Sequence, residues 1–578
     1  MSDRVNEKIT KKIDDIVKSK NIYYSGQVIR INNFIVEARG LDDAFYFEKV
    51  YINNEKNIGY VDKIEADRVF ISLIKTDGSI LIGDNVITTG EILEMRFSKD
   101  SVGMIIDPFG FDRMTGKKLN NSFPIPVETK KIGIMERTAV NRPLETGIAA
   151  IDLMFPIGRG QRQLIIGDKK TGKTQILLDT IANQKDKDVL CIYVAIGKNK
   201  KELKNLYAKL VQKGAHAYTI IMSVFNDDLP PLIKLTPYIA LSIAEGYMRD
   251  GRDVLVCIDD LKKHADACRE IALLSEKNTG RDAYPADIFY THSRLLEKGC
   301  QYKDGGSITI LPVVETKGAD ITDYISTNII SITDGQIVLS DKMFKKGQKP
   351  AIDYGLSVSR LGGNVQSDLI KKIGSKVRRE LLTYLEKVDV YQLVNIESMS
   401  EDLRNQLLRG EKIMNLLKQP KFSPISATEL NERFKFIDED DKSSDDEYDD
   451  YIPEDTDSYE EAEQEEVKEE PVKEKKKRKT SSRIQEIEPE KEVTEENEST
   501  EESSSEDEVE IKEESLPEES GENTSEEQED VEENTETKEI KKQISLDETM
   551  EIRLEKKEKT EDTVSDNTQV VPIIKNRG

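Results

Sequence analysis

The octapeptide GDKKTGKT, residues Gly167 to Thr174, matches the phosphate-binding pattern G-x-x-x-x-G-K-[ST]. It follows the apolar run QLII at 163–166, which predicts a strand, and it precedes apolar residues at helical spacing between 176 and 181. The pattern requires this context, because backbone N–H groups at the start of a helix bind phosphate. A chance glycine turn is the alternative, and the flanking strand and helix argue against it.

The motif assigns roles to its residues if the bound molecule is ATP or ADP with Mg. We expect Lys173 to contact the terminal phosphates and the Thr174 hydroxyl to contact Mg. Asp259 ends the apolar run VLVCID and is the candidate carboxylate for the Mg shell, whereas Asp260 reads as the cap of the next helix. The remaining loop residues are expected to surround the phosphates: Gly167, Asp168, Lys169, Lys170, Thr171 and Gly172.

Charge is distributed unevenly along the 578 residues. Residues 438–578 carry 54 acidic and 20 basic side chains, a net charge of −34. The first 437 residues carry 58 acidic and 65 basic side chains, a net charge of +7. The overall net charge of −27 therefore belongs to the C-terminal segment and says little about what the folded part binds.

The sequence indicates an intracellular protein. No apolar stretch reaches the roughly 20 residues that span a bilayer, and the N-terminus has no apolar signal region, so we expect a cytoplasmic chain. The four cysteines have no C-x-x-C spacing, which favours buried reduced thiols over disulfides or a zinc site. They are Cys191, Cys257, Cys268 and Cys300.

The texture of the sequence changes along the chain. An amphipathic helix is predicted at 1–21, either to pack on its own domain or to dock on a partner, and short β-type runs at 22–93 predict a small barrel. Between 94 and 366, apolar runs alternate with helical patterns, which predicts an α/β domain with a mainly parallel sheet. The runs expected to form strands are QRQLIIG (161–167), VLCIYVAIG (189–197), AYTIIMSV (217–224), DVLVCIDD (253–260), SITILPVVE (307–315) and IISITDG (329–335).

Longer stretches from about residue 22 to about residue 426 resemble the alpha subunit of the F-type ATP synthase. Matches of this length, in this order, are more specific than the phosphate loop alone. They are PLETGIAAIDLMFPIGRGQRQLIIGDKKTGKT (143–174), IDDLKKHADACREIALL (258–274), GRDAYPADIFYTHSRLLEKG (280–299), GSITILPVVETKGADITDYISTNIISITDGQIVLS (306–340) and PAIDYGLSVSR (350–360).

The resemblance implies a ring of six, in which alpha-type subunits alternate with catalytic beta-type subunits around a central shaft subunit. The complex would lie on the cytoplasmic face of the cell membrane as a peripheral part of a membrane apparatus, with no nucleic acid. Alpha subunits of this family bind Mg-ATP or Mg-ADP without turning it over and lend an arginine to the neighbouring beta site. Arg360 matches that arginine, and Ser357 matches the other functional position of the same motif.

The resemblance also places residues around the base of the nucleotide. Phe344 matches a family residue near the base, and Lys349 replaces the usual arginine before Pro350. Gln419 matches one of two glutamines that contact the purine, and Lys421 replaces the other.

Lys198 supports a non-catalytic role. Catalytic members of the wider family have a water-positioning glutamate after the second core strand, and ordinary alpha subunits have glutamine there; here the run is Ala195-Ile196-Gly197-Lys198. An ammonium group cannot accept a proton from water. Two alternatives are a self-sufficient hexameric translocase or helicase, which Lys198 argues against, and a scaffold that has lost nucleotide binding, which the intact loop argues against.

Residues 367–435 predict a helical domain that is truncated relative to ordinary alpha subunits, and 436–578 predict a disordered acidic tail. The tail either solvates the protein or attaches a partner, and its basic cluster at 475–479 reads as a charge block or as a nucleic-acid or localisation patch. The truncation and the tail favour a diverged F-like ATPase over an ordinary proton-coupled synthase. The predicted fold is therefore α/β, with a β-barrel, a RecA-like P-loop domain, a truncated helical domain and a tail.

Overall fold

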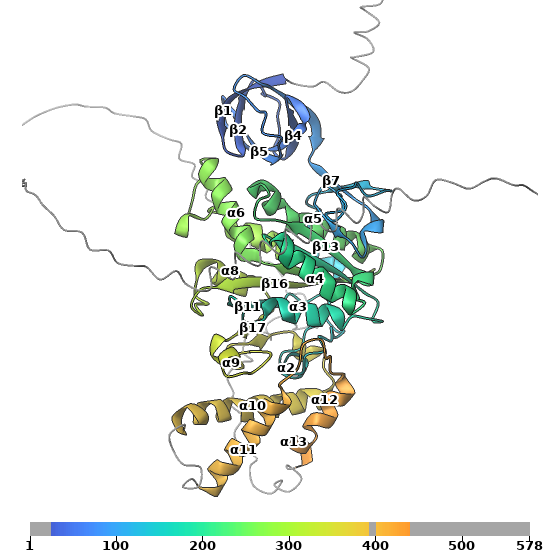
Figure 1. Cartoon of the computed structure of the whole chain (residues 1–578), viewed down its shortest axis with the longest axis vertical. Helices are drawn as coiled ribbons and strands as arrows, with labels where there is room; N and C mark the ends of the chain where they lie inside the picture. The colour runs from blue at the N-terminus through green and yellow to red at the C-terminus, as the bar shows by residue number, and fades with distance from the viewer. Residues whose placement is uncertain (1–24, 392–399, 440–578) are drawn as a thin grey trace, which may run out of the picture. The chain divides into compact units, whose positions relative to one another are not determined.

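The computed structural model describes residues 25–391 and 400–439 (Figure 1). The helix predicted at 1–21 and most of the tail predicted at 436–578 lie outside the described residues. Among those that are described, no helix is both long enough and apolar enough to cross a membrane.

The first part of the described chain is a closed six-stranded barrel in the order β1-β2-β5-β4-β3-β6, joined by antiparallel pairing. Alternate residues of its strands point inward, as period-2 sequences require, and Val28, Val36, Val50 and Val86 are among its buried core. The strands are β1 (Ser25–Asn32), β2 (Ile35–Arg39), β3 (Glu48–Ile52), β4 (Asn54–Ile64), β5 (Val69–Lys75) and β6 (Asn85–Ile92).

A ten-stranded, mainly parallel sheet follows, with the order β18-β17-β11-β16-β14-β12-β13-β8, and β15 and β10 attached beside β16. Parallel pairing joins β11, β16, β14, β12 and β13, whereas β17 and β18 pair antiparallel. The strands are β8 (Ile105–Ile106), β10 (Arg137–Thr138), β11 (Leu164–Asp168), β12 (Val189–Ile196), β13 (Thr219–Val224), β14 (Asp253–Asp259), β15 (Cys300–Tyr302), β16 (Ser307–Thr316), β17 (Gly335–Leu339) and β18 (Val358–Ser359). A separate pair is β7 (Glu94–Phe97) with β9 (Phe123–Pro126).

Helices cover both faces of this sheet, so its central strands are apolar throughout. Leu164 and Ile166 of β11 belong to one core with the helices α5 to α8, while Ile165 belongs to a second core with α2, α3 and α4. The helices are α2 (Ala149–Met154), α3 (Lys173–Ala182), α4 (Lys200–Gln212), α5 (Pro230–Arg249), α6 (Leu261–Leu274), α7 (Ile288–Leu296), α8 (Tyr324–Ile332) and α9 (Asp341–Lys345). All four cysteines are free and buried, as expected.

The strand predicted at 329–335 is wrong. Residues up to Ile332 are the end of α8, and the strand β17 begins only at Gly335. The β-branched residues favoured a strand, but Ile325 and Ile329, four residues apart, lie on one face of α8 and are both fully buried. Tertiary packing of that face overrides the local β preference.

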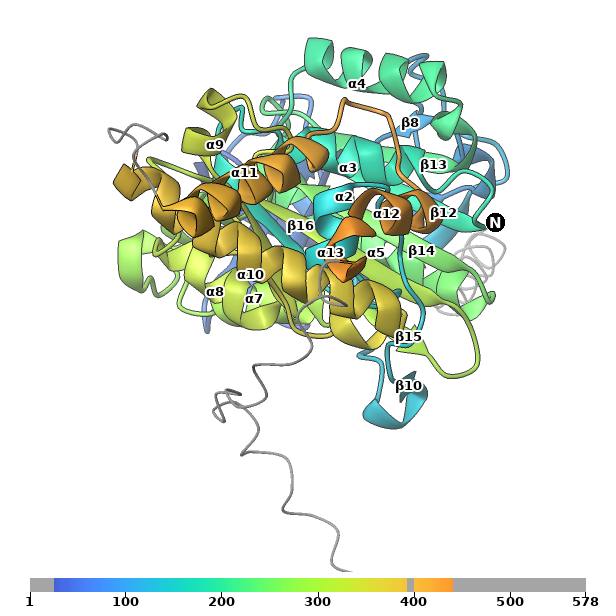
Figure 2. The same ribbon diagram turned by 90° about the horizontal axis from the view of Figure 1, so that it is seen from below.

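The C-terminal helices extend the second core. Figure 2 shows α10 and α11 side by side, with α12 near α2. Val377 and Leu381 of α10, Ile413 of α11 and Phe434 of α12 are buried in the same cluster as α2 and α3. These helices are α10 (Asp368–Tyr391), α11 (Glu401–Leu416), α12 (Ala427–Phe434) and α13 (Phe436–Glu439).

Two buried histidines make stability depend on pH. His264 of α6 lies 3.2 Å from His292 of α7, ring nitrogen to ring nitrogen, and both side chains are fully buried. Burial lowers the pKa of His264 to about 4 and holds the pKa of His292 well below its usual value. Both imidazoles are therefore neutral in the folded state at pH values where the unfolded chain is protonated.

We expect the folded chain to lose stability as pH falls from about 6.5 towards 4, because the unfolded state binds more protons in that window. At roughly 1.4 kcal/mol per pKa unit, His264 alone contributes a loss of about 3 kcal/mol. Urea unfolding across this pH range measures the slope. Replacing both histidines with glutamine should flatten it, and the control His216→Gln should not; an unchanged slope in the double variant would contradict this assignment.

Candidate functional site

The phosphate loop connects β11 to α3 at the carboxyl edge of the sheet. Gly172 at its end has φ +111°, a conformation that favours glycine. At the loop's start, a Cβ on Gly167 would lie 2.6 Å from the Leu339 carbonyl oxygen, so only glycine lets β11 approach β17 this closely. Lys173 is the first residue of α3, which places the helix N-terminus at the loop.

Lys173 lies inside the loop. Its Nζ donates to the carbonyl oxygens of Gly167 at 2.7 Å and Asp168 at 2.6 Å, and it lies 3.9 Å from a carboxylate oxygen of Glu315. Burial lowers the pKa of this ammonium, and the charge of Glu315 opposes the shift. Two backbone carbonyls of the loop thus hold the cation at the position from which a P-loop lysine meets phosphate.

The other loop residues divide into two groups. Asp168 accepts from the Thr316 hydroxyl at 2.6 Å and from the Ala319 N–H at 2.9 Å, so its carboxylate ties the loop to the end of β16. The Thr171 hydroxyl donates to the Asp168 carbonyl at 2.8 Å. Lys169 and Lys170 are exposed at the tip of the loop.

Thr174 and Asp259 meet, as the Mg hypothesis requires. The Thr174 hydroxyl donates to Asp259 Oδ2 at 2.7 Å, and the Tyr193 hydroxyl donates to the same oxygen at 2.6 Å. Lys198 Nζ lies 2.9 Å from that oxygen as well. Burial opposes ionisation of Asp259, but the Lys198 charge and these hydrogen bonds hold its pKa below the usual value. Asp260 caps α6, accepting from the Lys263 N–H at 2.9 Å, as expected.

One hydroxyl and one carboxylate at the end of a phosphate loop are ligand types for Mg, which proteins commonly hold through one or two side chains and the phosphates of the nucleotide. Lys198 adds a positive charge beside them. In the part of the chain that the structure describes, no three His, Cys, Asp or Glu side chains cluster as a metal site. Any Mg here would therefore depend on the nucleotide for its remaining ligands.

A cavity of about 280 Å³ lies beside the loop and offers room for a base. Thr171 and Gly172 of the loop line it together with Phe344 of α9 and Lys349, and Lys349 Nζ lies 5.2 Å from the centre of the Phe344 ring. Sequence reasoning missed three lining residues on α3, although their spacing from Gly172 places them on one helix face. They are Gln175, Ile176 and Asp179.

Gln419 lines this cavity but its amide is engaged by backbone groups. Its Oε1 accepts from the Ala149 N–H at 3.0 Å, and its Nε2 donates to the carbonyl oxygens of Gly147 and Ser423, each at 2.6 Å. In this conformation Gln419 joins the chain after α11 to the start of α2 and shapes the cavity. Lys421 also lines it.

Arg360 lies at the other end of β17 from the phosphate loop. β18 pairs antiparallel with β17 so that Ser359 faces Gly335, and the Arg360 N–H donates to the Asp334 carbonyl at 3.0 Å. Gly167 of the phosphate loop pairs in register with Leu339 of β17, which lies five residues after Asp334. Five residues of strand correspond to roughly 16 Å. Arg360 is exposed and lies at the amino edge of the sheet, the edge opposite its own phosphate loop.

Ser357 is fully buried and holds this segment. Its hydroxyl donates to the Asp353 carbonyl at 2.5 Å and accepts from the Val338 N–H at 3.0 Å. Two glutamines that sequence reasoning missed add to it: Gln163 donates to the Val358 carbonyl at 2.9 Å and Gln161 to the Ser359 hydroxyl at 3.1 Å. Local sequence carries no signal for these contacts, which span about 200 residues.

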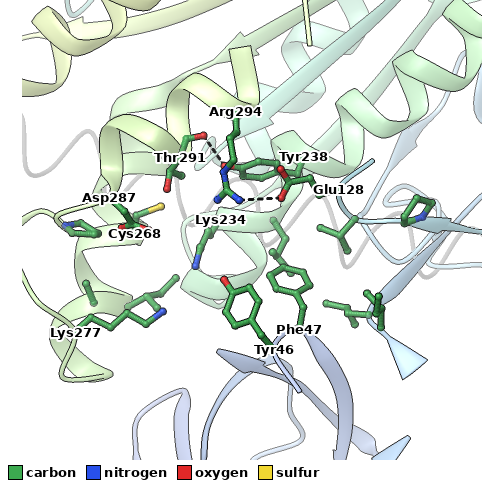
Figure 3. A pocket seen from close by; sticks show the side chains of 18 residues that line it. Tyr46, Phe47, Glu128, Lys234, Tyr238, Cys268, Lys277, Asp287, Thr291 and Arg294 are labelled. Carbon is green, nitrogen blue, oxygen red and sulfur yellow. Dashed lines mark hydrogen bonds and ion pairs between the residues drawn. The ribbon is translucent and has the colours of Figure 1, made fainter. Parts of the chain in front are cut away.

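A second cavity, of about 270 Å³, lies between the barrel and the α/β domain (Figure 3). Charged side chains of both signs line it: the cations Lys234, Lys277 and Arg294 and the acids Glu128 and Asp287. Arg294 pairs with Glu128 at 3.7 Å. No glycine loop lines it, so among the described residues the nucleotide site is assigned to the cavity at Gly172.

A strand, a glycine loop and a helix that together surround a buried lysine define a P-loop nucleotide-binding protein. Residues 147–359 match the family model described as "ATP synthase alpha/beta family, nucleotide-binding domain". The chain belongs to the ATP synthase alpha/beta family.

Three similar proteins are named as alpha subunits of ATP synthase. "ATP synthase subunit alpha" of Clostridium botulinum (strain Alaska E43 / Type E3) is 41% identical over 421 residues, which cover 72% of this chain and 83% of that relative. The protein of that name from Pediococcus pentosaceus is 41% identical over 429 residues, covering 74% and 84%. "ATP synthase subunit alpha, sodium ion specific" of Acetobacterium woodii is 42% identical over 402 residues, covering 69% and 80%.

Proposed function

We propose that this chain is the non-catalytic, nucleotide-binding alpha-type subunit of an F-type or F-like rotary ATPase. In the proposed assembly it alternates with a catalytic beta-type subunit in a six-membered ring around a shaft subunit, as a peripheral part of a membrane-associated complex. It holds Mg-ATP or Mg-ADP at its own phosphate loop and supplies Arg360 to the site of its neighbour.

The observation that carries the non-catalytic assignment is that the carboxylates at the phosphate loop already make hydrogen bonds and ion pairs within the chain. Hydrolysis needs a group that positions and deprotonates water near the terminal phosphate. Lys198 stands where catalytic relatives have glutamate, and Asp259 is occupied by Thr174, Tyr193 and Lys198. Asp168 is likewise used by Thr316 and Ala319. Glu315, the other carboxylate near Lys173, lies 3.9 Å from the ammonium of that lysine and so faces a cation of the loop.

The placement of Arg360 supports action in trans. Along the strand direction, Arg360 is separated from the phosphate loop of its own chain by about 16 Å. Hydrogen bonds of Ser357, Gln161 and Gln163 hold its segment. An exposed guanidinium on a segment held in this way, at the edge of the sheet, is suited to reach a neighbouring subunit. The complete geometry at Lys173 and Thr174 also argues against a scaffold that has lost nucleotide binding.

We expect the full-length chain to bind Mg-ATP and the Lys173→Ala variant to bind it about 10- to 100-fold more weakly, because charge-assisted hydrogen bonds to phosphate are lost. Titration calorimetry measures both affinities. The exposed residue Lys185, which follows α3, gives the matched control Lys185→Ala, whose affinity should not change. Equal affinity in wild type and Lys173→Ala would place the nucleotide elsewhere and overturn the proposal.

A further inference from the structure

Three donors converge on one oxygen beside the phosphate loop. The hydroxyls of Thr174 and Tyr193 donate to Asp259 Oδ2, and the Lys198 ammonium lies 2.9 Å from it. The Lys198 side chain is 18% exposed and that of Asp259 is 5% exposed, so this ion pair is largely shielded from water. The two side chains expected to hold Mg are thus already bonded to each other and to a cation of the chain itself.

Lys198 is held in this position by the backbone on both sides. Gly197 before it has φ +61°, and its N–H donates to the Val224 carbonyl at 2.8 Å. A Cβ on Gly197 would lie 2.5 Å from Asn226 Oδ1, so the turn is closely packed. Asn199 after it caps α4, accepting from the Glu202 N–H at 2.9 Å. Lys198 is therefore a built part of the site, unlike a long surface side chain that is free to reorient.

The position has an electrostatic consequence for both ligands of the site. A divalent ion at Asp259 and Thr174 would meet the positive charge of Lys198, and repulsion between like charges is strong where water is excluded. A nucleotide at the loop, in contrast, would meet a carboxylate that Lys198 already neutralises without any metal. The same ammonium therefore disfavours Mg and favours the free nucleotide.

We propose that Lys198 acts as a tethered cation that makes nucleotide binding at this site nearly independent of Mg. This inference rests on the proposed function, because it assumes that the nucleotide binds at Gly167 to Thr174. It adds that the site takes ATP or ADP with or without Mg, and that one side chain determines this tolerance.

The test compares ATP affinity in excess Mg with ATP affinity in EDTA, by calorimetry on the full-length chain. We expect the two ATP affinities of the wild type to agree within about threefold. The ATP affinity of Lys198→Gln should be at least about tenfold lower in EDTA than in Mg. Lys198→Arg, which keeps the charge, should behave more like wild type. The same substitution at the exposed Lys201 in the first turn of α4 is the matched control and should leave the ratio unchanged.

A direct metal readout completes the experiment. Mn²⁺ titrated into the ADP-bound chain and followed by electron paramagnetic resonance should bind at least about tenfold more tightly to Lys198→Gln than to wild type. If EDTA lowers the ATP affinity of wild type and of Lys198→Gln by the same factor, or if the two bind Mn²⁺ equally tightly, the inference is wrong. Failure of Lys173→Ala to weaken ATP binding would refute the proposed function instead, so the two failures are distinguishable.

Discussion

Replacing Arg360 with alanine should lower the ATPase rate of the native complex by about 10³- to 10⁵-fold, the range that arginine fingers contribute to phosphoryl transfer. The guanidinium stabilises negative charge that develops on the transferred phosphoryl group, and the proposal places that group in the neighbouring subunit. Steady-state phosphate release by complexes that carry the wild-type or variant chain measures the effect.

Assembly of the complex should survive this substitution. The Arg360 side chain is exposed, and only its backbone N–H bonds to Asp334, so truncation removes no contact that holds the fold of the described chain. Arg360→Lys should rescue poorly, because lysine lacks the planar fork that binds two oxygens at once. Arg39→Ala, at an exposed barrel arginine that pairs with Asp67, is the control. An assembled Arg360→Ala complex that hydrolyses ATP at the wild-type rate would contradict the role in trans.

The second large effect is expected at Asp62 of β4, whose side chain is fully buried between the barrel and the α/β domain. Its Oδ1 lies 3.5 Å from Lys234 Nζ and its Oδ2 lies 2.5 Å from Lys277 Nζ. Burial raises the pKa of Asp62, but the charges and hydrogen bonds of the two lysines outweigh it and hold the pKa below the usual value. The carboxylate therefore stabilises the fold above the pKa of the unfolded chain, and this contribution is lost as pH falls through the folded pKa.

Asp62→Ala should lower the free energy of unfolding by about 3 to 5 kcal/mol, because it leaves two mostly buried ammonium groups without their common partner. Urea denaturation at neutral pH measures the change. Asp67→Ala is the matched control in the same barrel, since its ion pair with Arg39 is exposed and worth at most about 1 kcal/mol. If the two variants unfold at the same urea concentration, the buried ion pair does not hold these domains together.

Local pattern was enough to predict much of this fold. The phosphate loop, the strand before it and α3 follow from a motif and from apolar spacing, and the cap at Asp260 follows from its place before a helical run. The barrel could be predicted because its short strands alternate and end at Gly, Asn and Asp. The strand expected at 329–335 failed because β-branched residues are also compatible with a short buried helix.

Contacts between distant residues were beyond sequence reasoning. The sequence showed a lysine at position 198, but only the fold brings its ammonium to Asp259, 61 residues later. Gln419 was assigned to the purine by resemblance, and the structure shows its amide bonded to backbone groups more than 260 residues earlier. The assignments of Arg360, Ser357 and the other site residues remain predictions until they are tested.

The most direct measurement of the central claim is phosphate release by the purified full-length chain at saturating Mg-ATP, beside the native complex. We predict no turnover above that of Lys173→Ala for the isolated chain, since Lys198 replaces the base, while the complex hydrolyses ATP. Turnover by the isolated chain at the rate of the complex, abolished by Lys173→Ala, would contradict the account and make this chain a catalyst.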